Sequence, residues 1–277
     1  MAALLALAPH RSTTAGLLAG AARERGMDVM VLPRCGVPER PPVNEGAHYY
    51  GGPHFASGVV GPLGISLLEP GERWLDSLPH AFTGRRVESV PLSVARRADG
   101  PFFAKPPTDK SFPAAVYENG GALPGPLAHP ARPAPLGDSL VQLSEVVIWT
   151  REFRLFLLDG RIRTGSQYAT FGRLDAVPLR GHRDEAAVQD FARQLTDAAG
   201  DTLPSGVVVD IGVLRRPGGG DAGQWAVVEA NMAWFSNVYA AEPARALDVV
   251  LRSAGPRAAV RERDARFHRR PPRQPLP

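Results

Sequence analysis

The sequence contains little cysteine, little lysine and no long hydrophobic run. Cys35 is the only cysteine among 277 residues, which excludes an internal disulfide and a zinc site built from several cysteines. No apolar run approaches the ~18–20 residues of a membrane helix. The apolar start MAALLALAPH has no basic segment before it, as a signal peptide would. We therefore expect a protein of the reducing cytoplasm with no membrane segment.

The positive charge is concentrated at the C-terminal end. The formal net charge is +4, and arginines far outnumber acids in residues 256–277, so the rest of the chain is near neutral. Aromatic residues do not alternate with the basic ones, as they would on a platform for single-stranded nucleic acid. We expect residues 256–277 to form a solvated, Pro- and Arg-rich disordered tail, and we do not expect nucleic acid as a partner.

The two lysines lie close together in the sequence. Lys105 and Lys110 are the only lysines among 32 basic residues; Lys105 ends an apolar run and Lys110 lies in the following loop, PPTDKSFPA. Lysine is a compact, mobile point charge that suits phosphate. The pair therefore indicates a loop that covers phosphates, although the pattern GxxxxGK[ST] is absent. Coincidence on a solvated loop is the alternative.

Residues 206–239 predict a β-hairpin that carries oxygen ligands. Two apolar runs flank the glycine-rich loop Pro217–Gly223. Asp210, Glu229 and Asn231 stand where apolar residues are expected, and the last two share a strand face because they are two residues apart. If Asp210 faces them across the hairpin, the three form a site for a magnesium–nucleotide complex. Solvent-facing acids are the alternative.

The dipeptide Asp159–Gly160 predicts a second hairpin with a two-residue loop. Such a loop pairs Phe156 with Arg163. Strand alternation then places Glu152, Arg154 and Arg163 on one face of the sheet. This face is either a solvated surface or an anion site in which the two arginines neutralise phosphate.

The chain opens with a strand–helix–strand order that predicts a small parallel sheet. These three elements are expected at 4–8, 15–25 and 27–32, and further helices at 184–199 and 243–251. Residues 33–62 are rich in Pro and Gly and are expected to be irregular, as a substrate-facing loop or a connector. His10 ends the first strand, where open α/β sheets bind ligands, with a structural role as the alternative. A turn at 93–100 predicts a domain boundary.

The order of these motifs resembles the ATP-grasp superfamily, and most of all bacterial ATP-grasp proteins of the two-arginine, one-lysine clade. The likeness rests on the segments FFAKPPTDKSFPAAVY, WTREFRLFLLDG and WAVVEANMAW. It implies an α/β (α+β) fold, with a small N-terminal parallel α/β domain and two subdomains that clasp the nucleotide. The implied units are the N-terminal domain 1–95, the lysine-loop subdomain 96–145, the C-terminal subdomain 146–255 and the tail 256–277.

The resemblance also implies roles for individual residues. The residues implied to bind ATP are Lys105 and Lys110 at the phosphates, Glu145, Val146 and Val147 at adenine, and Glu152 at the ribose. The implied Mg²⁺ ligands are Asp210, Glu229 and Asn231. The arginines implied to neutralise the γ-phosphate and the acyl phosphate are Arg154 and Arg163. Many superfamily members carry an arginine just before the first metal acid, whereas here Val207–Val209 precede it.

The implied reaction is carboxylate–amine ligation in small-molecule or peptide biosynthesis. ATP phosphorylates a small-molecule or peptide carboxylate, and an amine attacks the acyl phosphate to form an amide or peptide bond. One alternative is a phosphotransferase acting on a hydroxyl or a histidine, for which His10 and His182 are candidates. Another is a non-catalytic nucleotide-binding protein, or a ligase that modifies a protein terminus. The sequence names neither substrate and indicates no oligomeric state.

Overall fold

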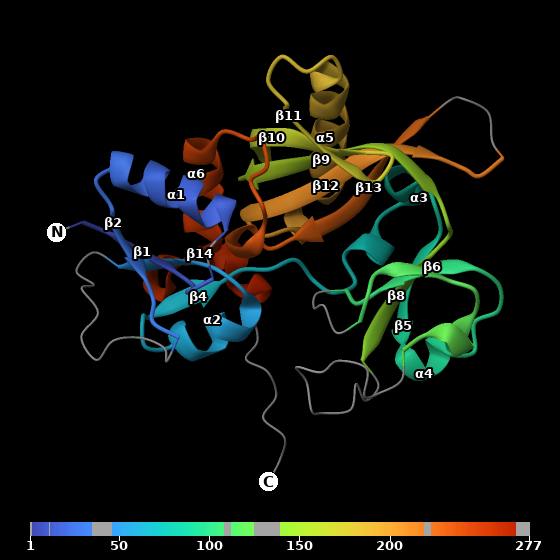
Figure 1. Cartoon of the computed structure of the whole chain (residues 1–277), viewed down its shortest axis with the longest axis horizontal. Helices are drawn as coiled ribbons and strands as arrows, with labels where there is room; N and C mark the ends of the chain where they lie inside the picture. Colours follow the sequence, from blue (N-terminus) through green and yellow to red (C-terminus); the bar gives the residue numbers. More distant parts are fainter. Residues whose placement is uncertain are drawn as a thin grey trace, which may run out of the picture.

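The computed structural model describes residues 2–10, 12–34, 46–107, 112–124, 139–218 and 223–269. Within them the strands form sheets of three, five, two and four strands. The N-terminal unit lies at the left of Figure 1, the four-stranded sheet at the lower right and the five-stranded sheet above and between them. None of the helices in these ranges is long and apolar enough to span a membrane.

The N-terminal unit is built on a parallel sheet, as the strand–helix–strand order predicts. The central strand β1 (Leu4–Leu7) lies between β2 (Asp28–Val31) and β3 (Ala47–Tyr50). The expectation that residues 33–62 are irregular is wrong where β3 and α2 (Pro53–Val59) form. Three of the four β3 side chains are buried, so tertiary packing outweighs the Pro- and Gly-rich context of that strand.

Helix α1 (Thr13–Glu24) connects β1 to β2 and has clear signals at both ends. The Ser12 hydroxyl accepts a hydrogen bond from the N–H of Ala15 at 3.1 Å, which satisfies one free donor of the first turn. Gly26 follows the helix with φ +74, a conformation that favours glycine. The predicted helix is therefore confirmed, and its buried face packs against the last long helix of the chain.

The second unit is an antiparallel sheet in the order β5-β8-β6-β7. Its strands are β5 (Val87–Pro91), β6 (Phe102–Lys105), β7 (Ala115–Tyr117) and β8 (Leu140–Ser144). The apolar run that ends at Lys105 is thus a strand. Because β5 pairs with β8, this sheet begins before the boundary expected at 93–100.

The third unit is a five-stranded antiparallel sheet in the order β11-β10-β9-β12-β13. Its strands are β9 (Ile148–Leu158), β10 (Arg161–Thr170), β11 (Arg173–Pro178), β12 (Gly206–Arg215) and β13 (Gln224–Asn231). Both predicted hairpins are confirmed. The turn between β9 and β10 has φ of +51 at Asp159 and +76 at Gly160, as a tight two-residue loop requires.

The predicted register of the hairpin of β9 and β10 is wrong beyond Ile162. Phe156 pairs with Thr164 instead of Arg163, because Arg163 is an extra residue in a β-bulge. The Arg163 side chain donates to Asp248 of α6 (Pro243–Ser253) at 2.6 Å. Hydrophobic alternation does not reveal a single inserted residue, so the sequence could not place this arginine.

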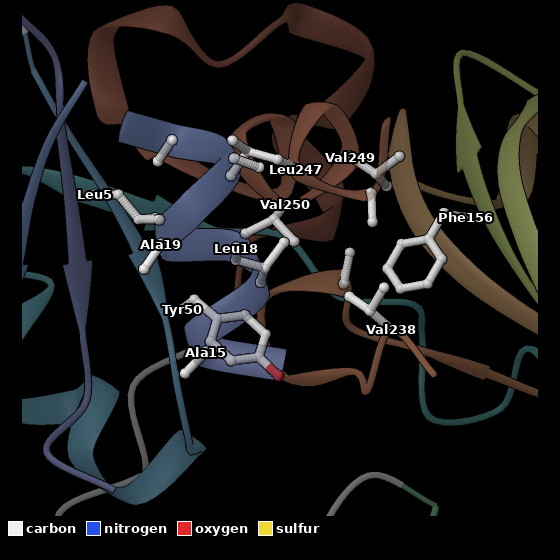
Figure 2. Close-up of a cluster of buried hydrophobic side chains, with 14 of the residues drawn as sticks. Leu5, Ala15, Leu18, Ala19, Tyr50, Phe156, Val238, Leu247, Val249 and Val250 are labelled. Atoms are coloured by element: carbon white, nitrogen blue, oxygen red, sulfur yellow. The ribbon is translucent and has the colours of Figure 1, made fainter. Parts of the chain in front are cut away.

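The two faces of the five-stranded sheet carry different cores. One face packs against α5 (Glu185–Ala199) through the helix residues Val188, Phe191 and Leu195. The other face packs against α6 through Phe156 and Val208, and α6 in turn packs against α1 (Figure 2). Both predicted late helices are thus confirmed. Farther along β9 and β12, this second face becomes polar.

The remaining elements are short. Two α-helical turns are α3 (His80–Thr83) and α4 (Leu92–Ala95). The 3₁₀ turns are η1 (Leu75–Ser77), η2 (Gly120–Ala122), η3 (Gly200–Thr202), η4 (Ala233–Phe235), η5 (Arg257–Ala259) and η6 (Glu262–Phe267). The two-stranded sheet pairs β4 (Ile65–Leu67) with β14 (Ala254–Pro256).

The C-terminal segment folds back onto the body of the protein. Asp264 in η6 is fully buried and accepts hydrogen bonds from the N–H and the hydroxyl of Ser205, at 2.7 and 2.6 Å. Arg261 pairs with Asp159 at 2.6 Å. The prediction of a disordered tail is therefore wrong for 256–269, because its side chains find partners that are distant in sequence. Residues 270–277 lie outside the described residues.

We expect Asp264→Ala to lower the free energy of unfolding by about 2–3 kcal/mol, because it leaves the buried N–H of Ser205 without its charged acceptor. Urea denaturation measures the change. Glu262→Ala is the matched control, since it removes an exposed acid from the same turn and should change the stability by less than about 0.5 kcal/mol. Equal stability of Asp264→Ala and the wild type would contradict this role for the segment.

Candidate functional site

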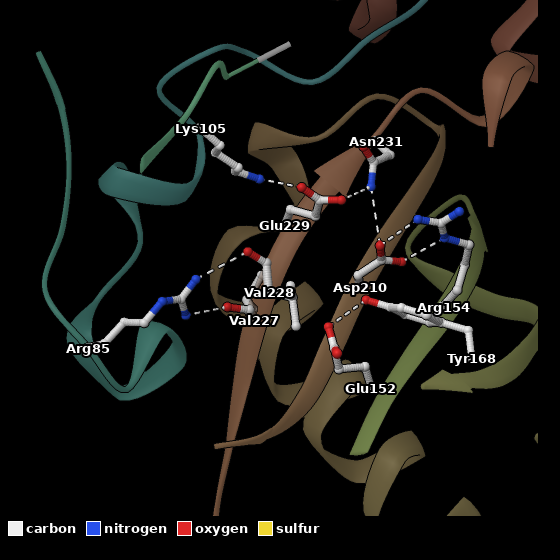
Figure 3. Close-up of polar contacts among 10 residues, drawn as sticks. All are labelled: Arg85, Lys105, Glu152, Arg154, Tyr168, Asp210, Val227, Val228, Glu229 and Asn231. Carbon is white, nitrogen blue, oxygen red and sulfur yellow. Dashed lines mark hydrogen bonds and ion pairs between the residues drawn. The ribbon is translucent and has the colours of Figure 1, made fainter. Parts of the chain in front are cut away.

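The centre of the polar region is a buried ion pair between neighbouring strands. Asp210 of β12 is 0% exposed and lies directly opposite Arg154 of β9. The Nε and Nη2 atoms of Arg154 donate to the two carboxylate oxygens at 2.9 and 2.7 Å (Figure 3). Burial alone would lower the pKa of Arg154, but the charge and hydrogen bonds of Asp210 outweigh burial and raise this pKa. No arginine precedes Asp210 in the sequence, but Arg154 of the neighbouring strand β9 places a positive charge beside it.

Two tyrosines hold the guanidinium of Arg154 from the other side. The rings of Tyr168 and Tyr239 stack with centroids 5.2 Å apart, and the guanidinium lies 5.5 and 5.2 Å from these two centroids. Tyr239 has φ +52, which is uncommon for a residue other than glycine. Sequence reasoning gave these two tyrosines no role at the ion pair, because only the tertiary fold brings them together.

Glu152 lies on the same face of β9 as Arg154 and accepts a hydrogen bond from the Tyr168 hydroxyl at 2.8 Å. Burial raises the pKa of Glu152, and the negative charges of Asp210 and Glu229 raise it further, while the Tyr168 hydrogen bond opposes them. Its placement beside the ion pair agrees with the predicted common face of Glu152 and Arg154. Its role towards a ribose stays a prediction.

Strand β13 brings two more polar side chains to Asp210. Glu229 is the register partner of Asp210, and the Asn231 amide donates to Glu229 at 2.8 Å and to Asp210 at 3.2 Å. Lys105 reaches across from β6 and pairs with the other oxygen of Glu229. Burial alone would raise the pKa of Glu229, but the Lys105 charge and the hydrogen bonds lower it to about 2. Asp210, Glu229 and Asn231 therefore converge across the hairpin as predicted.

The predicted adenine segment connects the two sheets. Glu145, Val146 and Val147 follow β8 and precede β9. The Glu145 carboxylate accepts from the N–H of Arg86 at 3.1 Å and lies 3.4 Å from the guanidinium of Arg216. Val146 and Val147 are half-buried. The segment thus occupies the connection between the units, and its contact with a nucleotide stays a prediction.

Two other predicted residues do not join the cluster, and a third, Lys110, lies outside the described residues. Arg163 pairs with Asp248 of α6. Of the two predicted arginines, Arg154 is the one that reaches Asp210. His182 packs edge-on against Phe153, on the sheet face that α5 covers.

A cavity of about 520 Å³ opens beside the cluster, with Arg154, Glu229 and Asn231 in its wall. The rest of the wall comes from the N-terminal unit and from the segment after β13. Its remaining lining residues are Ala8, His10, Ser12, Ala15, Tyr50, Gly51, Gly52, Phe235, Ser236, Asn237 and Tyr239. The cluster therefore has adjoining space for a second molecule, and His10 keeps a possible ligand role.

The oxygen atoms of the cluster suit a magnesium ion. Two carboxylates and one amide are hard ligands, and phosphate or water oxygens would complete the coordination. No group of three His, Cys, Asp or Glu residues suitable for a metal occurs in the described ranges. Arg154 and Lys105 neutralise the two carboxylates, and a bound cation would take over that function. The donor set therefore fits Mg²⁺ bound together with a phosphate-bearing ligand.

Comparison with known proteins identifies the family. Residues 82–249 match the model of an ATP-grasp domain family, the second family of the two-arginine, one-lysine clade. This match covers more than half of the chain, so the protein belongs to this family and has an ATP-grasp fold. No curated protein sequence matches the chain.

Several solved structures are similar at low sequence identity. A RimK domain ATP-grasp protein from Sphaerobacter thermophilus is 15% identical, with 90% of this chain and 100% of that chain covered and a TM-score of 0.50. A RiPP-associated ATP-grasp ligase from Chryseobacterium gregarium, in complex with ADP and a leader and core peptide, is 12% identical, with 96% and 99% covered and a TM-score of 0.47. D-alanine–D-alanine ligase from Bacillus anthracis is 10% identical, with 91% and 97% covered and a TM-score of 0.44.

We expect Lys105→Met to lower the free energy of unfolding at pH 7 by about 1–2 kcal/mol, because Glu229 loses the charge that lowers its pKa. A carboxylate whose pKa is lowered on folding stabilises the protein above its unfolded pKa. The pKa of Glu229 falls from 4.5 to about 2, so this contribution is present above 4.5 and is lost as the pH falls towards 2. Urea denaturation between pH 7 and 3 should show the difference from wild type shrinking below pH 4.5.

Lys105→Arg is the matched control for this experiment, because it keeps the positive charge and should keep most of the pH-dependent stability. A difference between Lys105→Met and wild type that stays constant down to pH 3 would show that the ion pair does not set the pKa of Glu229.

Proposed function

We propose that the protein is an ATP-dependent ligase that joins a carboxylate to an amine through an acyl-phosphate intermediate. Membership of the ATP-grasp family supports the use of ATP. The observation that carries the proposal is the convergence of Lys105, Arg154, Asp210, Glu229 and Asn231 beside a cavity. Such a cluster suits a reaction in which a phosphoryl group passes from ATP to a carboxylate while negative charge develops on the departing phosphate oxygens.

Different segments of the chain are assigned to the adenine, the ribose and the phosphates of the proposed nucleotide site. We assign adenine to the connection at Glu145–Val147, the ribose hydroxyls to Glu152 and the phosphates to Lys105, with Lys110 assigned there from the sequence alone. Lys105 is 14% exposed and lies on the opposite sheet from Glu152, so the proposed site is bounded by both sheets.

The proposed magnesium ligands are Asp210, Glu229 and Asn231. A magnesium ion held by these residues would neutralise the negative charge of bound phosphate. In the structure, Arg154 and Lys105 neutralise the same carboxylates. We propose that both cations turn to phosphate oxygens when a metal ion binds, so that Asp210 and Glu229 always have a positive charge beside them.

We assign the cavity beside Arg154 to the acceptor, a small-molecule or peptide carboxylate. Arg154, in the wall of this cavity, would neutralise the γ-phosphate beside the carboxylate, whose oxygen attacks the γ-phosphorus as ADP leaves. The amine nitrogen then attacks the acyl carbon, phosphate leaves, and the nitrogen loses a proton. No side-chain nucleophile is needed, so the protein contributes positioning and preorganised charge.

The phosphotransferase alternative has one structural argument. His10 lines the cavity, whereas the other histidine candidate, His182, packs on the opposite face of the sheet. A phosphotransferase would form ADP without any amine and leave a stable phosphorylated product, whereas a ligase requires the amine and releases inorganic phosphate.

The test is ADP formation with a panel of amino acids and dipeptides as carboxylate and amine substrates. We expect amine-stimulated ADP and phosphate release in the wild type, reduced at least about 100-fold in the variant Asp210→Asn/Glu229→Gln, which removes preorganised charge. Asp197→Asn, an exposed aspartate on α5, is the matched control and should keep wild-type turnover. Undiminished turnover in the double variant would contradict the magnesium assignment, and amine-independent ADP formation would favour phosphoryl transfer.

A further inference from the structure

Arg85 is a buried cation close to the carboxylate cluster that sequence reasoning did not assign to the site. Arg85 lies two residues before β5 in the sequence and is only 5% exposed. The guanidinium lies 5.0 Å from the ring centroid of Trp149. Burial lowers the pKa of Arg85 to about 10, opposed by the charges of Glu229 and Glu145, so the guanidinium is protonated at neutral pH.

The described hydrogen bonds of Arg85 go to backbone carbonyls instead of to a carboxylate. Nη1 donates to the carbonyls of Thr83 and Val227 at 3.0 and 2.8 Å, and Nη2 donates to the carbonyl of Val228 at 3.2 Å (Figure 3). Val227 and Val228 lie on β13, immediately before Glu229. A buried charge is costly in free energy, so its use on these two carbonyls calls for a reason.

The reason is the β-bulge in the hairpin of β12 and β13. Ile211 pairs with Val227 and Asp210 pairs with Glu229, so Val228 is an extra residue with no register partner. A bulge disrupts the ladder locally and leaves backbone groups that another part of the chain must satisfy. Arg85 binds the carbonyls of the two peptide groups that flank the extra residue Val228.

The bulge decides which face of the sheet Glu229 occupies. Val227 faces the core beneath α5. By strict alternation from Val227, the second residue along, Glu229, would face that core as well, and so would Asn231. The extra residue reverses the alternation and turns both side chains to the face of Asp210. The cluster therefore depends on a single inserted residue in an edge strand.

We propose that Arg85 is a positioning residue that fixes the bulge at Val228 and thereby holds Glu229 opposite Asp210. Strand β13 is at the edge of its sheet, where no further strand limits its register. Arg85 supplies that restraint from the unit that carries Lys105, the partner of Glu229. The bulge itself is independent of the proposed function, whereas its effect on metal binding rests on the proposed function.

The first test measures amide hydrogen exchange of the ligand-free protein over β13. Arg85→Met keeps a long apolar side chain over Trp149 but removes the donors, and we expect exchange across 224–231 to become about tenfold faster or more, since hydrogen bonds to charged groups contribute about 1.5–3 kcal/mol. Arg85→Lys restores the charge and should recover part of the protection. Arg86→Met is the matched control, because the Arg86 side chain is 79% exposed, and exchange should match the wild type.

Unchanged exchange over β13 in Arg85→Met would overturn the proposal. Faster exchange throughout the chain, including α1, would also overturn it, because Arg85 would then be a general stabilising residue. If Arg85→Met does not fold, Arg85→Lys decides the question: intermediate protection confined to β13 supports the proposal, and wild-type protection overturns it.

The second test measures ADP binding by calorimetry with and without Mg²⁺. We expect Arg85→Met to lose about tenfold or more in affinity when Mg²⁺ is present, and to bind ADP without metal within about twofold of the wild type, because only the carboxylates are displaced. Equal losses with and without Mg²⁺ would overturn the positioning role. Absence of ADP binding to the wild type would refute the proposed function instead, and hydrogen exchange would still decide the role of Arg85.

Discussion

The ion pair between Asp210 and Arg154 is the interaction on which the rest of the site depends. A carboxylate with no solvent exposure lies in the interior of a five-stranded sheet, where an apolar residue would pack without electrostatic cost. Buried ion pairs add little net stability, although losing one partner costs about 3–5 kcal/mol. The pair is therefore poorly explained as a device for stability. Its position between β9 and β13 instead makes Asp210 the fixed point about which Arg154, Glu229 and Asn231 are arranged.

Two of the three acids at this fixed point are paired with cations. Arg154 pairs with Asp210 and Lys105 with Glu229, whereas the Glu152 carboxylate accepts a hydrogen bond from Tyr168. The pKa of Glu152 is raised and that of Glu229 is lowered. A triphosphate with its magnesium ions brings both negative and positive charge. The site can therefore accept the complex if Arg154 and Lys105 turn from the carboxylates to the phosphates and the metal binds the carboxylates. The four-stranded sheet contributes Lys105. Arg85, in the segment that leads into β5 of the same sheet, donates hydrogen bonds to β13. Both contacts make the geometry of Glu229 depend on the second unit.

Turns and strand faces could be predicted from the sequence, because they depend on neighbouring residues. Contacts between residues far apart in the sequence could not. Glycine-rich and Asp-Gly turns identified both hairpins, and the spacing of Glu229 and Asn231 identified their common face. The bulge at Arg163 escaped prediction because one inserted residue leaves the apolar pattern intact. The pairing of Asp264 with Ser205, the stacking of Tyr168 with Tyr239 and the contacts of Arg85 with β13 join residues at least 59 positions apart. No local pattern encodes such contacts, and the basic composition of the tail pointed away from the first of them.

The direct test is a crystal structure with a non-hydrolysable ATP analogue and Mg²⁺, because Lys105 and Arg154 are proposed to neutralise Glu229 and Asp210 until a metal ion does so and the two cations turn to phosphate. We expect metal density at the oxygens of Asp210 and Glu229, with the Nζ of Lys105 released from Glu229 and bound to a phosphate oxygen. Retention of the Lys105–Glu229 and Arg154–Asp210 pairs, with the nucleotide bound elsewhere on the protein, would contradict it.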